Sequence, residues 1–306
     1  MNNCYTILGA GGAIGIPLAK VLFDTGKRVR LVSRAPKSAG RNEELVVADL
    51  LKESDVIRAC DQSEVVFLLA GMHYSAKVWE VQWPVVMRNT IIGCKASGAR
   101  LVFFDNVYPY GLVNGPMTEA TPYNPCSRKG EVRARIATDL MIEVKNGFQA
   151  LIARSADFYG PNVKNSITES LIFQRIKAGK SGQWFCDADL PHSLTFTPDA
   201  ASATALLGST LSAFGQTWHL PTAAPALTGR EFIEKVAEVY GNTPKVQIFS
   251  KAVLTLGGLF VEVVRESKEM LYQYDHPYHF DSSKFVKCFH IDATSYANGI
   301  QASICT

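Results

Sequence analysis

The stretch Tyr5-Thr-Ile-Leu-Gly-Ala-Gly-Gly-Ala-Ile-Gly15 decides the fold. Its first four residues form a short apolar run that stops at Gly9, and a helical pattern begins at Ala13. Gly9 permits a sharp turn, Gly12 removes the Cβ that would keep a pyrophosphate off the backbone, and Gly15 lets the helix pack close to the strand. Free N–H groups at the helix N-terminus then favour an anion. The pattern predicts dinucleotide binding; the alternative is a glycine-rich turn that binds nothing.

Short apolar runs alternate with helical patterns through the first half of the chain. We expect strands at residues 5–8, 29–33, 44–50, 64–69, 101–104 and 150–153. Alternation of this kind implies a parallel sheet with helices on both faces. The fold class is therefore α/β, a Rossmann-type doubly wound parallel sheet.

The end of the second strand carries the clue to the cofactor. A site that reads a ribose 2′-hydroxyl would place Asp or Glu there, about 20 residues past the glycines. This chain has Ser33-Arg34 instead, and a guanidinium can bind a 2′-phosphate through two charge-assisted hydrogen bonds. NADP is thus favoured over NAD, unless Arg34 only stacks on adenine or faces solvent. Asp49 and Gly71 also follow strands, although Asp49 could equally close a strand at the surface.

Several helices have clear sequence signals. A helix at 79–94 is expected to be broken or kinked near Pro84. Ser127 or a neighbour caps a helix that carries Lys129 and Arg133 on one face. Residues 167–178 read as a helix, and Thr228-Gly-Arg-Glu231 reads as a capping box that opens another.

Composition excludes several classes of protein. The chain has 306 residues, of which 47% are hydrophobic and 19% charged, so it can bury a large core. Its net charge of only +3, without a basic run, gives no reason to expect nucleic acid or a membrane surface as partner. Seven scattered cysteines, Cys305 among them, have no C-x-x-C spacing, and no secretory peptide or membrane-length apolar stretch is visible. We expect reduced thiols, a cytoplasmic location and no bound metal.

An ordered set of motifs resembles the extended or atypical short-chain dehydrogenase/reductase superfamily, in its NAD(P)-dependent epimerase/dehydratase branch. The segment Arg154 to Pro161 is similar to that branch's Arg-x-x-x-x-Tyr-Gly-Pro, and His192 to Ala200 to its later His-Ser-x-x-x-x-x-Asp-x-Ala. The likeness runs from Tyr5 to about Ile300. With the strand-end positions above, it implies a cofactor site made by Gly9, Gly12, Ala13, Ile14, Gly15, Ser33, Arg34, Asp49, Leu50, Ala70, Gly71 and Lys129.

The resemblance also implies a second domain. A Rossmann domain at residues 1–155, joined by about 190–215, would bind NADP. A smaller C-terminal α/β domain at 156–189 and 216–306 would bind a small-molecule substrate in the cleft between them. A homodimer is expected from the resemblance alone, because this superfamily often dimerises through the helices that flank the Lys.

The chain departs from the superfamily at the positions of the catalytic residues. A Tyr-x-x-x-Lys pair normally holds the nicotinamide ribose and moves the proton, and a Ser or Thr holds the substrate oxygen. None of the eleven tyrosines here has a Lys four residues on. Lys129 stands where the Lys should be, but Pro125 precedes it at the Tyr position, and the Ser/Thr position falls at Asn106 or Val107.

Three hypotheses follow. In the first, Lys129 keeps its ribose role, Asn106 replaces the Ser or Thr, and Tyr108 or Tyr110, ahead of Tyr123, gives the proton in an NADP-dependent oxidoreductase or epimerase-like reaction on a small carbonyl or sugar-like substrate. In the second, the fold binds NADP(H) without turnover, as a redox sensor or regulatory protein. In the third, the glycine turn is accidental and the chain is a scaffold. The sequence leaves the substrate open.

Overall fold

The large sheet has the strand order of a dinucleotide-binding domain. The computed structural model describes residues 4–38, 40–163 and 166–304. Across these residues, seven parallel strands form one sheet in the order β3-β2-β1-β4-β5-β6-β10. They are β1 (Cys4–Leu8), β2 (Arg28–Ser33), β3 (Glu44–Val47), β4 (Ser63–Leu68), β5 (Arg100–Asn106), β6 (Ala150–Ser155) and β10 (Thr217–His219). The order reverses between β1 and β4, which is where open α/β sheets bind their ligands.

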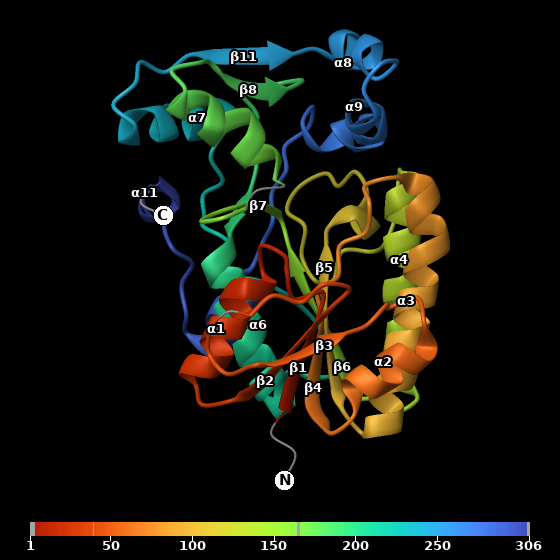
Figure 1. Ribbon diagram of the computed structural model, residues 1–306. Coiled ribbons are helices and arrows are strands. Elements are labelled where there is room, and N and C mark those ends of the chain that lie inside the picture. Colours follow the sequence, from red (N-terminus) through yellow and green to blue (C-terminus); the bar gives the residue numbers. More distant parts are fainter. Residues whose placement is uncertain (1–3, 39, 164–165, 305–306) are drawn as a thin grey trace.

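Helices cover both faces of this sheet (Figure 1). On one face lie α1 (Gly15–Asp24) and α6 (Thr197–Ser209), and on the other lie α2 (Glu53–Cys60), α3 (Ala76–Ser97) and α4 (Arg128–Lys145). The central strands β1, β4 and β6 are buried along nearly their whole length, as expected for strands covered on both sides. The predicted Rossmann-type α/β fold is therefore confirmed.

The C-terminal part of the chain lies above the carboxyl ends of the sheet (Figure 1). It contains two parallel strand pairs, β7 (Asp157–Tyr159) with β9 (Leu194–Phe196) and β8 (Gly182–Phe185) with β11 (Val246–Phe249). Its helices are α5 (Gln174–Lys177), α7 (Gly229–Val239), α8 (Lys251–Gly257), α9 (Glu262–Ser267) and α11 (Tyr296–Ile304). Helix α10 (Ser283–Phe289) packs instead against β10 of the large sheet. Short helical turns are η1 (Tyr108–Tyr110), η2 (Glu169–Phe173), η3 (Leu211–Ala213) and η4 (Lys268–Gln273).

Two predicted caps are confirmed. The Ser127 hydroxyl accepts a hydrogen bond from the backbone N–H of Gly130 (3.0 Å) at the start of α4. Thr228 and Glu231 form a complete capping box at the start of α7, each side chain accepting from the other residue's backbone N–H. Both caps satisfy N–H groups that the first helical turn leaves without partners.

Four boundaries differ from the sequence prediction. The first helix begins at Gly15, two residues later than expected, and β3 ends at Val47, so Asp49 lies in the loop beyond it. The predicted break at Pro84 is wrong, because α3 is one helix through this residue. Burial of apolar side chains on both sides of the proline offsets the lost hydrogen bond. The helix expected at 167–178 is a π-helical turn, η2, that leads into the short α5.

The domain boundaries remain a prediction. Strand β10 pairs with β6 in the large sheet, and it lies just beyond the segment 190–215 that was expected to return to the Rossmann domain.

The six described cysteines are all unpaired, and Cys305 lies outside the described residues. None of the described helices has the length and apolarity needed to cross a bilayer.

Candidate functional site

A cavity of about 930 Å³ opens at the carboxyl ends of the central strands. Its lining includes every cofactor-binding residue predicted from the sequence except Lys129, namely Gly9, Gly12, Ala13, Ile14, Gly15, Ser33, Arg34, Asp49, Leu50, Ala70 and Gly71. A cavity of this size is at the upper end of the range for small-molecule and cofactor sites. The fold thus brings together residues from four separate strand ends.

The glycine loop forms one wall of the cavity. Gly9 has φ +89°, and a Cβ there would lie 2.5 Å from the Ala70 Cα, so only glycine fits where β1 and β4 end. A Cβ on Gly15 would lie 2.5 Å from the carbonyl oxygen of Ala10, so the close approach is to the loop itself and not to the strand. A Cβ on Gly12 would meet nothing nearer than 3.9 Å. No side chain caps α1. Within its first turn the Ile16 N–H donates to the Gly12 carbonyl oxygen (3.4 Å) and Pro17 has no N–H, so an anion at this end would rely on the backbone of the glycine loop and on the helix dipole.

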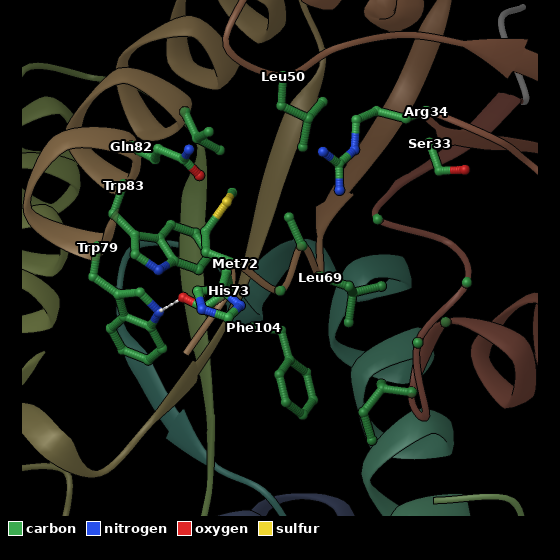
Figure 2. Close-up of a pocket in the computed structure, with 18 of the residues that line it drawn as sticks. Ser33, Arg34, Leu50, Leu69, Met72, His73, Trp79, Gln82, Trp83 and Phe104 are labelled. Carbon is green, nitrogen blue, oxygen red and sulfur yellow. Dashed lines mark hydrogen bonds between the residues drawn. The ribbon is translucent and has the colours of Figure 1, made fainter. Parts of the chain in front are cut away.

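The second wall comes from β2 and the loop after β3. Figure 2 shows the exposed Arg34 side chain with its guanidinium turned toward the cavity beside Leu50. Asp49 lines the same end, and its Oδ1 accepts a hydrogen bond from the backbone N–H of Leu51 (3.0 Å). This bond uses one carboxylate oxygen of Asp49 to shape the loop, while the guanidinium of Arg34 presents a positive charge to a ligand.

The opposite wall is aromatic and belongs to α3. Trp79 and Trp83 face the cavity across from Ser33 and Arg34 (Figure 2). The Trp79 indole N–H donates to the carbonyl oxygen of His73 (3.1 Å), which holds the ring in place. Phe104 forms part of the floor (Figure 2). Flat apolar walls of this kind suit an adenine or nicotinamide ring.

Of the four predicted catalytic residues, only Asn106 lines this cavity. Its Oδ1 accepts from the backbone N–H of Tyr108 (3.1 Å), and the Tyr108 ring stacks against Trp79 with centroids 6.2 Å apart. Burial raises the pKa of Tyr108 well above its ordinary value. Tyr110 is buried elsewhere and hydrogen-bonds His219 Nε2 (2.7 Å), and Tyr123 accepts from Arg154 (3.0 Å). Tyr108 therefore lies behind the cavity wall, and the other two phenols are engaged in the core.

Lys129 lies away from the cavity. Its ammonium is fully buried and contacts the carboxylates of Glu266 (2.8 Å) and Glu269 (2.7 Å) and the Glu266 carbonyl oxygen (2.9 Å). Among the described residues that line the 930 Å³ cavity there is neither Lys nor Tyr. A role at the cofactor ribose, as the resemblance implied, would require both carboxylates to release this ammonium.

The structure shows a buried ionic cluster that the sequence analysis missed. Asp105, at the end of β5, accepts from Arg133 Nε on one carboxylate oxygen and from Arg154 Nη2 on the other, both at 2.7 Å. Burial opposes ionisation of Asp105, but the two guanidinium groups hold its pKa below the ordinary value. Asp105 and Arg133 line the cavity. The sequence signals were the shared helical face of Arg133 and Lys129 and the position of Arg154 directly after a strand, where bracing the end of the sheet was one of the two expected roles.

A second, small cavity of about 20 Å³ lies between the two parts of the chain. Tyr74 and Tyr108 line it from one side, and Asp157 and Tyr274 from the other. Asp157 Oδ2 accepts from the Tyr274 hydroxyl (3.2 Å) and lies 3.0 Å from His192 Nε2. Such a volume holds about one water molecule. The phenol of Tyr108 thus lies between the large cavity and this small one.

Known structures share the whole fold. UDP-glucose 4-epimerase from Thermus thermophilus, solved with NAD, aligns over 99% of this chain and 98% of its own, with a TM-score of 0.80 and 18% identity. UDP-N-acetylglucosamine 4-epimerase from Bacillus cereus aligns over 99% and 95%, with a TM-score of 0.77 and 16% identity. The dTDP-glucose 4,6-dehydratase DesIV from Streptomyces venezuelae, a double mutant with NAD bound, aligns over 98% of this chain and 95% of its own, with a TM-score of 0.78 and 17% identity.

Comparison at the level of sequence identifies the family. No curated protein matches the chain. The family model described as NAD dependent epimerase/dehydratase family matches residues 5–207. This range contains the glycine loop, Arg34, the α3 wall and the strand ends that form the large cavity. The resemblance found in the motifs is confirmed, and the chain belongs to the NAD-dependent epimerase/dehydratase family.

Proposed function

We propose that this chain binds NADP(H) in the large cavity and acts as an oxidoreductase or epimerase-like enzyme on a small carbonyl or sugar-like substrate. The observation that carries the proposal is that Arg34 and the glycine loop line the same cavity, with the Arg34 guanidinium turned toward it. Four proteins of the same fold were solved with NAD, which supports a nicotinamide nucleotide. The preference for NADP rests on Arg34 and on the lack of an acidic residue at the end of β2.

Asn106 and Tyr108 are the proposed catalytic residues. When bound, NADPH supplies a hydride to a carbonyl carbon. The Asn106 amide would hold the carbonyl oxygen, because Asn106 lines the cavity at the end of β5. Tyr108 would give the proton, because its backbone N–H binds the Asn106 side chain and so places the two residues side by side. Burial raises its pKa and makes the phenol a weaker acid than an ordinary tyrosine. Tyr110 is a weaker candidate because its hydroxyl is committed to His219.

One observation favours a second candidate, binding of NADP(H) without turnover. The Lys129 ammonium is neutralised by two carboxylates, and no phenol lines the large cavity among the described residues. A chain that holds the cofactor without a proton donor beside it would report the NADP/NADPH ratio to a partner.

A substrate screen separates the two. We expect NADPH oxidation with at least one member of a panel of aldehydes, ketones and keto sugars. Tyr108→Phe should lower that rate about 100-fold or more and leave NADPH affinity unchanged, because only the proton donor is lost. Binding of NADPH with no oxidation across the panel would contradict turnover and support binding without catalysis. Equal rates for Tyr108→Phe and the unchanged protein would remove Tyr108 from the mechanism.

A further inference from the structure

Three glutamates on one face of α9 and η4 meet the Rossmann part of the chain. Glu262, Glu266 and Glu269 follow i, i+4, i+7 spacing, and we call residues 262–273 the strap. Glu262 lies 3.5 Å from His73, at the mouth of the large cavity. The strap comes from the C-terminal part, and its acidic face therefore connects the two parts of the molecule.

Two of these carboxylates bind the first amides of α3 and α4. Glu266 Oε2 accepts from the backbone N–H of Ala76, and Glu269 Oε2 from that of Arg128, both at 2.8 Å. Ala76 and Arg128 are the first residues of their helices. A carboxylate there satisfies an open N–H group and faces the positive end of the helix dipole.

Lys129 holds both carboxylates at once. Its Nζ donates to Glu266 Oε2 (2.8 Å), to the Glu266 carbonyl oxygen (2.9 Å) and to Glu269 Oε1 (2.7 Å), so all three donors of the ammonium are used. It also lies 4.5 Å from the centre of the Tyr74 ring. Burial opposes ionisation of Glu266, but Lys129 and the Ala76 N–H hold its pKa below the ordinary value. The ammonium has no donor left for a ribose hydroxyl.

The strap closes the small cavity. Ser267, Met270, Leu271 and Gln273 form its side of the lining, opposite Tyr74 and Tyr108. The volume is only about 20 Å³, so anything larger than a water molecule requires the lining to move, and the strap forms one side of that lining. The contacts that resist this movement include those of Lys129 and the hydrogen bonds from the Ala76 and Arg128 amides.

We propose that Lys129 is a positioning residue that fastens the strap over the small cavity, and that its ammonium does not contact the nucleotide. The fastening of the strap is inferred from the contacts of residues 262–273 and does not depend on the proposed function. The statement about the nucleotide rests on the proposed NADP(H) binding. In this chain the lysine that stands at the Lys position of the absent Tyr-x-x-x-Lys pair would hold the small cavity closed.

Hydrogen exchange measured by mass spectrometry on the full chain tests the first part. Lys129→Met and the double variant Glu266→Gln/Glu269→Gln should each raise amide exchange in residues 262–274 about tenfold, because a charge-assisted network is lost. Combining them should add little, since both changes remove the ion pairs between the Lys129 ammonium and the two carboxylates. Lys129→Arg should restore protection. Lys95→Met, which removes a partly exposed lysine paired with Glu143, is the matched control and should leave the strap unchanged.

Unchanged protection of residues 262–274 in both Lys129→Met and the double glutamine variant would contradict the proposal that Lys129 fastens the strap. Titration of the same proteins with NADPH tests the second part. We expect Lys129→Met and the double variant to change NADPH affinity by the same factor. A tenfold loss in Lys129→Met alone would instead place the ammonium on the nucleotide and overturn this part. Failure of the unchanged protein to bind NADPH would overturn the proposed function. The exchange data would still show whether Lys129 fastens the strap.

Discussion

Glycines in the first loop meet different constraints at neighbouring positions. The sequence predicts a sharp turn at Gly9, a close approach of the pyrophosphate at Gly12 and close packing of the helix on the strand at Gly15. The structure separates them, because a Cβ at Gly9 or Gly15 would collide with backbone, whereas a Cβ at Gly12 has open space on the cavity side. Gly9 and Gly15 are therefore required by the fold, and we infer that Gly12 is required by the ligand.

Gly12→Val tests this distinction at the residue scale. We expect its thermal melting to match that of the unchanged protein, and its NADPH affinity to fall about 100-fold or more, because the side chain fills the space for the pyrophosphate. Gly9→Ala should instead lose more than about 2 kcal/mol of folding free energy, because its φ is positive and its Cβ meets the Ala70 backbone. Melting curves and fluorescence titrations measure both. Native NADPH affinity in Gly12→Val would contradict the assigned phosphate site.

At the scale of elements, one carboxylate joins β5, β6 and α4. Asp105 pairs with Arg154 on β6 and Arg133 on α4, and all three side chains are almost completely buried. The Arg133 guanidinium also lies 4.4 Å from the Trp83 ring centre, so the cluster supports the α3 wall. Three elements that shape the large cavity thus depend on a single negative charge.

Asp105→Asn should be strongly destabilising. Two buried guanidinium groups would lose their counter-charge, and breaking a buried pair costs about 3–5 kcal/mol. Asp189→Asn, which removes one partner of the exposed Arg230 pair, should cost less than about 1 kcal/mol. Urea denaturation measures both. A loss for Asp105→Asn no larger than that of the control would show that the cluster is not essential to these elements.

Strand β10 carries a histidine that makes folding sensitive to pH. His219 is buried, its Nδ1 donates to the carbonyl oxygen of Asp281 (2.8 Å), and its Nε2 accepts from Tyr110. Burial lowers its pKa to about 3. Between this value and the ordinary pKa of about 6.5, the unfolded chain binds a proton that the folded chain does not.

Stability should therefore fall as the pH drops below about 6.5, with a slope of up to about 1.4 kcal/mol per pH unit from this group. The contribution of Asp105 has the same sign but appears only at lower pH, because its ordinary pKa is 3.8 and its folded pKa is lower still. His219→Gln, which does not titrate, should flatten the profile measured by urea denaturation between about pH 6.5 and pH 4.5. An identical slope in both proteins would assign the effect to other groups.

At the scale of the whole molecule, the sheet and the cofactor cavity follow from local sequence. Short apolar strands and a glycine loop after the first strand are enough to predict the sheet type and the edge at which ligands bind. The helix starts capped by Ser127 and Thr228 were predicted, whereas α8, α9, α10 and α11 were not. The interruption expected at Pro84 was wrong because packing, which the sequence alone does not show, maintains the helix.

The contacts of the proposed catalytic residues could not be predicted in the same way. The partners of Lys129 lie 137 and 140 residues away along the chain, and His219, the partner of Tyr110, lies 109 residues away. No local pattern reports such pairings. Motif position alone placed Lys129 at the ribose, whereas the C-terminal part of the fold supplies two carboxylates that hold it elsewhere.

Calorimetric titration of the purified chain with NADPH, and then with NADH, tests the central claim most directly. We predict saturable binding of both, with NADPH at least about tenfold tighter, because the Arg34 guanidinium binds the 2′-phosphate through charge-assisted hydrogen bonds. Arg34→Ser should abolish the difference and leave NADH affinity unchanged. If neither nucleotide gave a heat of binding, or if NADH bound more tightly than NADPH, the proposed NADP(H) site would be contradicted.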